Sequence, residues 1–281
     1  MLKLLKQART ALRHLNPDEV RKMALRPVHI GLVAADGAAY GEMEDYLIPA
    51  GVGPERRLEL LEFVHRAGDP GVPDQVDVVL YYEGISGPKG TYTFHPADPG
   101  ASVRGMLHGN DDIALPLARQ FSPFRRPVVE QTIHAVSQEN AIFAVATALP
   151  DVVPNLMEVP WALGEWASDT AFLTANQVRM AFLIAAACDR EVGFAHQKLE
   201  ILSIGGGAFG WRALARELAG KIPLGGGLIP KGAIAYAGTF AVGKGLEHLY
   251  GANARMSGEA RKSIYRQGLE RGREIVQSLT R

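Results

Sequence analysis

Hydrophobic positions in the first half of the chain form two strand-like runs separated by helix-like spacing. Residues 28–34 and 76–82 are short apolar runs rich in β-branched side chains, so we expect two buried strands. Residues 38–47 and 54–65, which lie between them, space their apolar positions as helices do, and residues 111–120 also read as a helix. Strands joined by helices favour a small, mostly parallel α/β domain.

Two finer expectations follow from the same pattern. The helix over 54–65 would place Leu58 and Leu61 on one apolar face. The stretch 84–109 is rich in Gly, Pro and Ser, which predicts a loop holding at most one short strand at 91–94.

The second half of the chain carries helical spacing only. Long helix-like segments cover residues 128–149, 161–188, 194–218, 230–250 and 258–279. We therefore divide the chain into a helical segment 1–26, an α/β domain 27–125 and an all-α domain 126–281.

The N-terminal segment is basic and amphipathic. Residues 1–15 combine apolar side chains at helical spacing with four cations and no acid: Lys3, Lys6, Arg9 and Arg13. Such a helix can lie on an anionic membrane surface, and packing against the body of the protein is an equally good interpretation. Asn16, Pro17 and Glu19 have the pattern of a helix start, and Pro27 ends that helix.

Composition narrows the classes of function. Thirty Lys and Arg balance thirty Asp and Glu, so the chain has no overall attraction for nucleic acid. The single cysteine, Cys188, excludes an intramolecular disulfide and indicates a reducing compartment. With no secretory signal or spanning segment recognised, we expect a cytoplasmic protein. The basic segment 1–15 adds the expectation that it lies at the inner face of the membrane.

The first strand and its turn occupy the place where a nucleotide-binding domain carries its phosphate loop. Such a loop needs glycine amides, a Lys for the phosphates and a Ser or Thr for magnesium. The turn offers Asp36, Gly37 and Ala38 instead, and no guanine-recognition motif follows. These three residues are the candidates for a degenerate nucleotide site, whose acid would repel phosphate.

Residues 238–245, near the C-terminus, nearly match the sequence pattern of a phosphate loop. The segment reads Gly-Thr-Phe-Ala-Val-Gly-Lys-Gly, in which Gly245 replaces the required Ser or Thr. Ala233, Ala237 and Ala241 precede Gly245 at four-residue spacing, which favours close packing of helices over phosphate binding. We interpret the glycine triplet 205–207 in the same way, as a position where helices pack closely.

Metal and nucleophile motifs are missing. The eight histidines never stand at helical metal-ligand spacing, and no Gly-x-Ser-x-Gly motif occurs. Cys188 follows an apolar segment, so we interpret it as a small core residue. We expect no catalytic residues, no metal and no other cofactor.

Charged residues interrupt the apolar helices of the second half. Asp169, Asn176, Gln177 and Arg179 could form a buried polar layer with Arg212, because a buried charge is tolerated only when it is paired. Ion pairs that set helix register are the favoured interpretation. The alternative is acid–base chemistry, as in a hydrolase that uses Asp169 or Glu165.

Residues 139–250 resemble the bacterial helical domain of unknown function found with Era- or Ras-like GTPase modules, in the YcjF-like group. The similar segments are 148–150, 167–181, 210–217 and 222–243. This resemblance implies a GTPase-like domain upstream, at 27–125, and association with the inner face of a membrane through apolar helices. The missing Lys and Ser or Thr depart from the GTPase pattern.

Together these observations predict a non-catalytic protein. It would combine a degenerate GTPase-like α/β domain with a helical domain that contacts a membrane surface or a protein partner. The alternative is a GTP-binding protein or weak hydrolase with an atypical phosphate loop.

Overall fold

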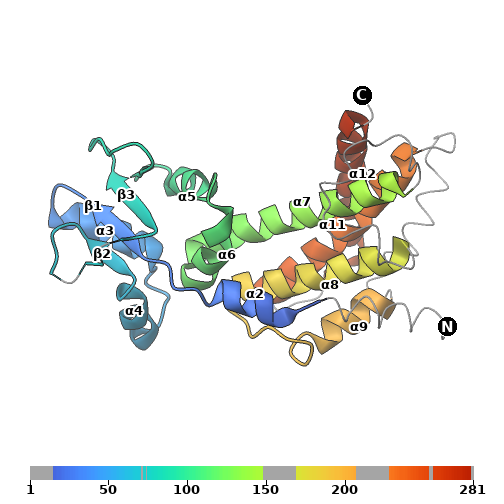
Figure 1. Cartoon of the computed structure of the whole chain (residues 1–281), viewed down its shortest axis with the longest axis horizontal. Coiled ribbons are helices and arrows are strands. Elements are labelled where there is room, and N and C mark those ends of the chain that lie inside the picture. The colour runs from blue at the N-terminus through green and yellow to red at the C-terminus, as the bar shows by residue number, and fades with distance from the viewer. Residues whose placement is uncertain are drawn as a thin grey trace. The chain divides into compact units, whose positions relative to one another are not determined.

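The computed structural model describes residues 15–70, 72–73, 75–147, 169–206, 228–252 and 256–279 (Figure 1). The chain divides into two compact units. The sheet unit comprises Arg21–Glu130 and the short segment Ala186–Arg190, and the helical unit comprises the remainder. Compared with the expected division at residues 26 and 125, the sheet unit begins earlier, ends later and takes in a distant segment.

The sheet unit is built on four parallel strands in the order β2-β1-β3-β4. The strands are β1 (Ile30–Val33), β2 (Val64–Arg66), β3 (Val78–Tyr82) and β4 (Tyr92–Phe94). Ile30 lies opposite Val64 on one side and Val78 on the other, so β1 is central and the strand order reverses beside it. An α/β region with a small parallel sheet therefore agrees with the sequence pattern. The same order occurs in doubly wound folds of several kinds.

Two helices follow β1, as the spacing of apolar residues predicted, and they lead to β2. They are α3 (Gly37–Leu47) and α4 (Pro54–Leu61), and α3 contacts β1 while α4 contacts β2. The expected apolar face of the second helix is wrong, because Leu58 is 68% exposed and Leu60 is buried. The helix stops at Leu61, and residues 64–66 pair with β1 as β2, although the sequence pattern extended the helix to residue 65.

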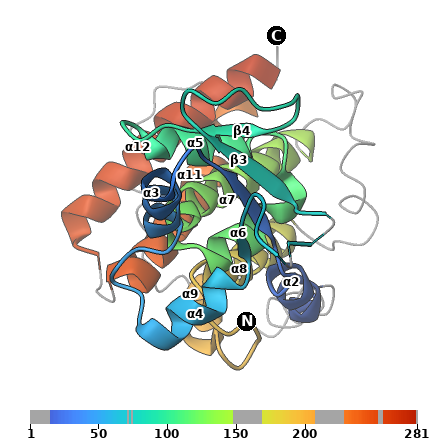
Figure 2. The same ribbon diagram turned by 90° about the vertical axis from the view of Figure 1, so that its left-hand side faces the viewer.

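The expectation of a loop over 84–109 is also wrong in part. Besides β4, this stretch contains α5 (Pro99–Leu107), which contacts β4 (Figure 2). The Asp98 carboxylate accepts a hydrogen bond from the Ala101 amide at 3.1 Å, and Pro99 occupies the first helical turn. This cap and proline stabilise a helix start that the glycine content obscured. The next helix is α6 (Asp111–Gln120).

The helix predicted after Asn16 is α2 (Pro17–Ala24). Asn16 caps it, because its side-chain oxygen accepts from the Asp18 amide at 3.0 Å and its side-chain nitrogen donates to Glu19 at 3.2 Å. The basic segment predicted over 1–15 lies outside the described residues except for Leu15, which packs against Ala171 and Ala175.

Five helices form most of the described part of the helical unit. They are α7 (Ser122–Ala146), α8 (Asp169–Ala187), α9 (Lys198–Gly206), α11 (Leu228–Ala252) and α12 (Gly258–Leu279). Helix α7 begins before Pro127 and belongs to both units, with its residues from Gln131 onward in the helical unit. No strand occurs in the described part of this unit, in agreement with the all-helical pattern of the sequence.

Helices α11 and α12 approach each other closely through small residues. A side chain at Gly268 would meet Ala237 Cα at 3.0 Å, and one at Gly272 would meet Ala233 Cα at 3.0 Å. The four-residue repeat of small side chains on α11 therefore serves helix packing, as the sequence suggested for Ala233 and Ala237.

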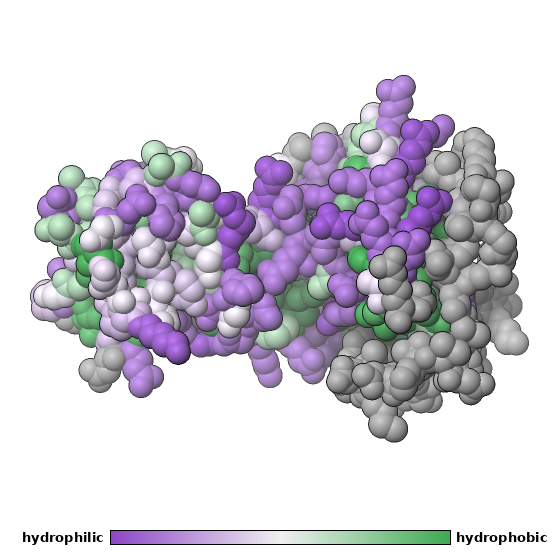
Figure 3. All heavy atoms as spheres, turned by 90° about the horizontal axis from the view of Figure 1, so that it is seen from above, coloured by the Kyte–Doolittle hydropathy of each residue, from purple (hydrophilic) through white to green (hydrophobic). Residues whose placement is uncertain are grey.

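The described surface is largely polar in the view of Figure 3, where hydrophobic side chains show only in patches. None of the described helices is both long enough and apolar enough to cross a membrane.

Candidate functional site

The turn after β1 is the first candidate for a ligand site in the sheet unit. Ligands of doubly wound folds bind beyond the carboxyl ends of the strands, at the point where the strand order reverses. Asp36, Gly37 and Ala38 lie there and all three are exposed. Asp36 is the N-cap of α3, and its carboxylate accepts a hydrogen bond from the Ala39 amide at 2.9 Å. The aspartate thus takes one of the helix-start amides that a phosphate loop would offer to its ligand.

Further carboxylates lie on the helix that follows this turn. The Tyr82 hydroxyl at the end of β3 donates to Glu42 at 2.7 Å, and this hydrogen bond is the main cause of the raised pKa of Tyr82. Arg66 at the end of β2 donates to both oxygens of Glu44, at 2.6 and 2.7 Å. The arginine at this edge is therefore already bound to a carboxylate.

The electrostatics of this edge oppose a phosphate. Asp36 and Glu42 are acids near the reversal point, and coulombic repulsion from both contributes to the raised pKa of Tyr82. Phosphate sites usually combine a cation with free helix-start amides. This turn supplies an acid and a capped helix instead.

The second phosphate-loop imitation, residues 238–245, lies within the helix α11. A side chain at Gly243 would clash with Ile133 at 2.7 Å and would meet the Met180 sulfur at 3.1 Å. A phosphate loop must present its amides to the ligand, whereas helical amides are bonded within the helix. Packing therefore accounts for Gly243.

A buried polar layer joins α7, α8 and α11 inside the helical unit. Asn140 and Thr239 are fully buried, and Asn176 is 2% exposed. The Asn140 side chain donates to Thr239 Oγ1 at 2.7 Å and accepts from Asn176 Nδ2 at 3.0 Å. Gln177 Nε2 also donates to Thr239 Oγ1, at 3.3 Å. These contacts give polar groups inside an apolar bundle the hydrogen bonds that burial requires.

An ion pair flanks this layer. Arg179 Nη2 donates to the two Glu139 oxygens at 3.0 and 2.9 Å, and Asn176 Nδ2 reaches the same carboxylate at 3.1 Å. The structure thus brings together Asn176 and Arg179 of the predicted layer. The predicted partners are not seen there, because the Asp169 side chain and Arg212 lie outside the described residues, as does Glu165.

Sequence reasoning missed Glu139, Asn140 and Thr239 as members of the layer. One signal was available: Asn140 immediately precedes the apolar segment 141–145, and an unpaired amide buried there would be costly. Nothing in the sequence shows that it faces Thr239, a residue almost a hundred positions away.

The described residues give no sign of a metal site, since no three His, Cys, Asp or Glu side chains gather in a way that could hold an ion. Cys188 is only partly buried and follows the last residue of α8. The interpretation of Cys188 as a core residue therefore needs correction, because α8 ends at Ala187 and leaves the thiol at its margin.

Comparison with known proteins does not identify the chain. No known family matches it, and neither a curated protein nor a solved structure is significantly similar to it.

Proposed function

We propose that this chain is a non-catalytic binding protein. Its sheet unit is a degenerate GTPase-like domain that holds no nucleotide, and its helical unit, of the YcjF-like type, is the interaction module. Its place would be the cytoplasmic side of a membrane, at the surface.

The side chain of Asp36 is the main support for the first part of this proposal, that the sheet unit holds no nucleotide. It caps α3 at the turn where a GTPase-like domain would bind the phosphates of its nucleotide, and no lysine accompanies it in that turn. A phosphate there would have to displace a hydrogen-bonded carboxylate and tolerate its charge. This supports loss of the nucleotide site over an atypical but working one.

The nucleotide proposal is tested by calorimetry of the full chain with GTP and with ATP, each with and without magnesium. We expect no magnesium-dependent binding, because nothing in the turn replaces the lysine and the magnesium-binding hydroxyl. Micromolar affinity that requires magnesium would instead establish the nucleotide-binding alternative.

Exposed leucines support the second half, contact with a membrane surface. Leu199 and Leu202 lie three residues apart on α9 and are 76% and 60% exposed, with Lys198 beside them. Large apolar side chains next to a cation suit the boundary between lipid headgroups and acyl chains. The basic segment 1–15 would add electrostatic attraction to an anionic leaflet.

Vesicle flotation at low and high salt tests this contact. The full chain should float with anionic vesicles at low salt, and the double variant Leu199→Ser, Leu202→Ser should float less. Leu58→Ser, an equally exposed leucine of the sheet unit, is the matched control and should behave like the unaltered chain. If the unaltered chain fails to float with anionic vesicles at low salt, the membrane proposal is wrong.

A further inference from the structure

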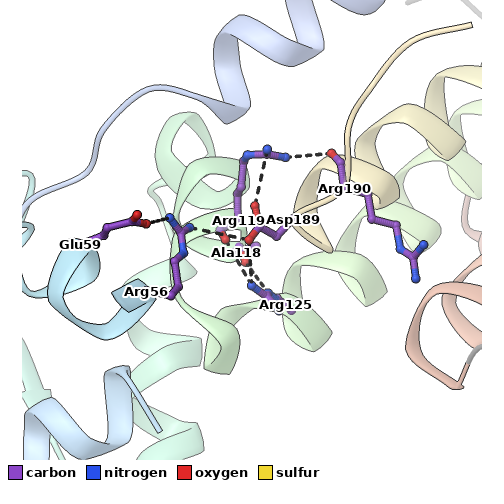
Figure 4. Close-up of polar contacts among 7 residues, drawn as sticks. All are labelled: Arg56, Glu59, Ala118, Arg119, Arg125, Asp189 and Arg190. Carbon is purple, nitrogen blue, oxygen red and sulfur yellow. Dashed lines mark hydrogen bonds and ion pairs between the residues drawn. The ribbon is translucent and has the colours of Figure 1, made fainter. Parts of the chain in front are cut away.

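Three arginines of the sheet unit converge on one aspartate. Arg56 comes from α4, Arg119 from α6 and Arg125 from α7, and all three reach the carboxylate of Asp189 (Figure 4). Asp189 belongs to the short segment Ala186–Arg190, which is part of the sheet unit although it is distant in sequence. The cluster therefore gathers cations from three helices around a single anion, which a fourth segment of the chain supplies.

The contacts to Asp189 are long. Its oxygens lie 3.7 Å from Arg56, 3.5 Å from Arg119 and 3.7 Å from Arg125. Charge-assisted hydrogen bonds of arginine are normally about 2.7–2.9 Å. A carboxylate has two oxygens, and here it is shared by three guanidinium groups without a close bond to any of them. The three guanidinium groups therefore leave room for an anion larger than the Asp189 carboxylate.

Positive charge exceeds negative charge in this cluster. The remaining acid, Glu59, accepts from Arg56 at 2.9 Å, so three guanidinium groups face two carboxylates. The Arg119 side chain is only 15% exposed, and a largely buried cation is costly unless anions compensate it. A second negative charge at the position of the Asp189 carboxylate would balance the group.

The other bonds of the arginines hold them in place. Arg119 Nη1 donates to the Arg190 carbonyl at 2.9 Å, and Arg125 Nε donates to the Ala118 carbonyl at 3.2 Å. Asp189 itself has a φ of 56°, the left-handed region in which Asp and Asn are the best tolerated side chains after Gly. The site is thus pre-organised, with its acid on a sharp bend of the chain.

From this geometry we propose that Arg56, Arg119 and Arg125 form a binding site for a dianionic phosphate group, which displaces the Asp189 carboxylate. Phosphate carries the missing second charge and an additional acceptor oxygen, and guanidinium forks match its geometry. The ligand is inorganic phosphate or the phosphate monoester of a lipid headgroup. The proposal does not depend on the proposed function, because none of these residues belongs to the turn at Asp36.

The first experiment titrates the full chain with inorganic phosphate at constant ionic strength and follows binding by calorimetry. Asp189→Asn keeps the shape and tolerates the left-handed backbone but removes the competing charge, so it should bind phosphate about tenfold more tightly. Arg119→Gln should lose binding. Arg56→Gln, at a more exposed position, should weaken it without affecting the fold.

The matched control is Arg126→Gln, which removes the neighbouring arginine of α7, an 83% exposed side chain paired with Glu130. It should leave phosphate affinity unchanged. The proposal is overturned if Asp189→Asn binds no more tightly than the unaltered chain, or if Arg126→Gln weakens binding as much as Arg56→Gln does.

A second experiment distinguishes the source of the phosphate. Vesicles containing phosphatidic acid, a phosphate monoester, compete with inorganic phosphate for Asp189→Asn if a lipid headgroup enters the site, and fail to compete if only free phosphate does. Both results support a phosphate site, and competition by phosphatidylglycerol vesicles, whose phosphate is a diester, would contradict it. Magnesium-dependent GTP binding that survives Arg119→Gln would contradict the proposed function and leave this site unaffected.

Discussion

At the scale of single residues, the buried amide of Asn140 shows how one side chain can organise a helical bundle. It bonds Thr239 on α11 and Asn176 on α8, and so links three helices through the buried polar layer. A buried polar group that loses its hydrogen-bond partner still bears the free-energy cost of desolvation. Asn140 therefore stabilises the fold mainly by hydrogen bonding to the buried groups of Thr239 and Asn176.

Replacement of Asn140 by Ala should therefore destabilise the protein by about 1–3 kcal/mol, because Thr239 and Asn176 lose a hydrogen-bond partner. Urea unfolding measures the change. The double variant with Thr239→Val should cost less than the sum of the two single changes, since both remove the same bond. Strict additivity would show that the two side chains are not coupled.

Tyr265 on α12 provides a second residue-scale prediction, on alkaline stability. Burial raises the pKa of Tyr265 to about 12. Because the folded form holds its proton above the usual pKa of 10, the unfolded state loses the proton first as pH rises. The free energy of unfolding should thus be unaffected by this group below pH 10 and should fall as pH rises from there towards 12.

Unfolding at a series of alkaline pH values checks this expectation. Tyr265→Phe removes the titrating hydroxyl and should flatten that part of the pH dependence. An equally steep decline in Tyr265→Phe would show that other groups cause it.

At the scale of elements, the contact between α11 and α12 depends on glycines at positions where no side chain fits. A Cβ added at Gly272 would lie 3.0 Å from the backbone of Ala233, whereas a Cβ added at Gly238 would have no atom within 4 Å. Both glycines are inside helices, so helix propensity alone would favour alanine at each.

Gly272→Ala and Gly238→Ala should accordingly change stability in opposite directions. The first should destabilise by about 1–3 kcal/mol through overpacking against backbone. The second should stabilise by up to about 1 kcal/mol through helix propensity. Thermal or urea unfolding of both variants gives the sign of each change in the free energy of unfolding. Stabilisation by Gly272→Ala would show that α11 and α12 can move apart without loss of stability.

At the scale of the whole molecule, the division into two compact units predicts that local perturbations stay local. His65 and His29 lie in the sheet unit with Nε2 and Nδ1 2.8 Å apart. Partial burial, and secondarily the nearby His29, lower the pKa of His65 from 6.5. The unfolded state therefore takes up the proton first, and the stability contributed by this group falls as pH drops below 6.5.

Hydrogen exchange by peptide, expressed as protection factors, tests where that loss occurs. Acidification below pH 6.5 should reduce protection in the sheet unit before the helical unit, and His65→Gln should diminish the difference. Gly272→Ala should reduce protection chiefly in the helical unit. Equal loss of protection in both units under either change would indicate one cooperative body.

Local pattern was sufficient for the order and kind of most elements. The runs at 28–34 and 76–82 became β1 and β3, and α12 covers the same residues as its apolar spacing, because side-chain period follows directly from backbone geometry. Pattern failed at 64–66 and 99–107. Residues 64–66 form a strand of only three residues, which is stabilised by pairing with β1. Residues 99–107 are rich in proline and glycine but form a helix whose start is capped by Asp98.

Which residues meet was decided by the tertiary structure alone. Asn140 and Thr239, or Arg56, Arg119 and Asp189, are far apart in sequence, and no periodicity within one element shows which face another will cover. The acid at the turn after β1 was visible in the sequence, but its role as a helix cap required the backbone dihedrals of Asp36. Residue type sets which contacts are chemically favourable, and only packing in three dimensions chooses among the many partners that would satisfy them.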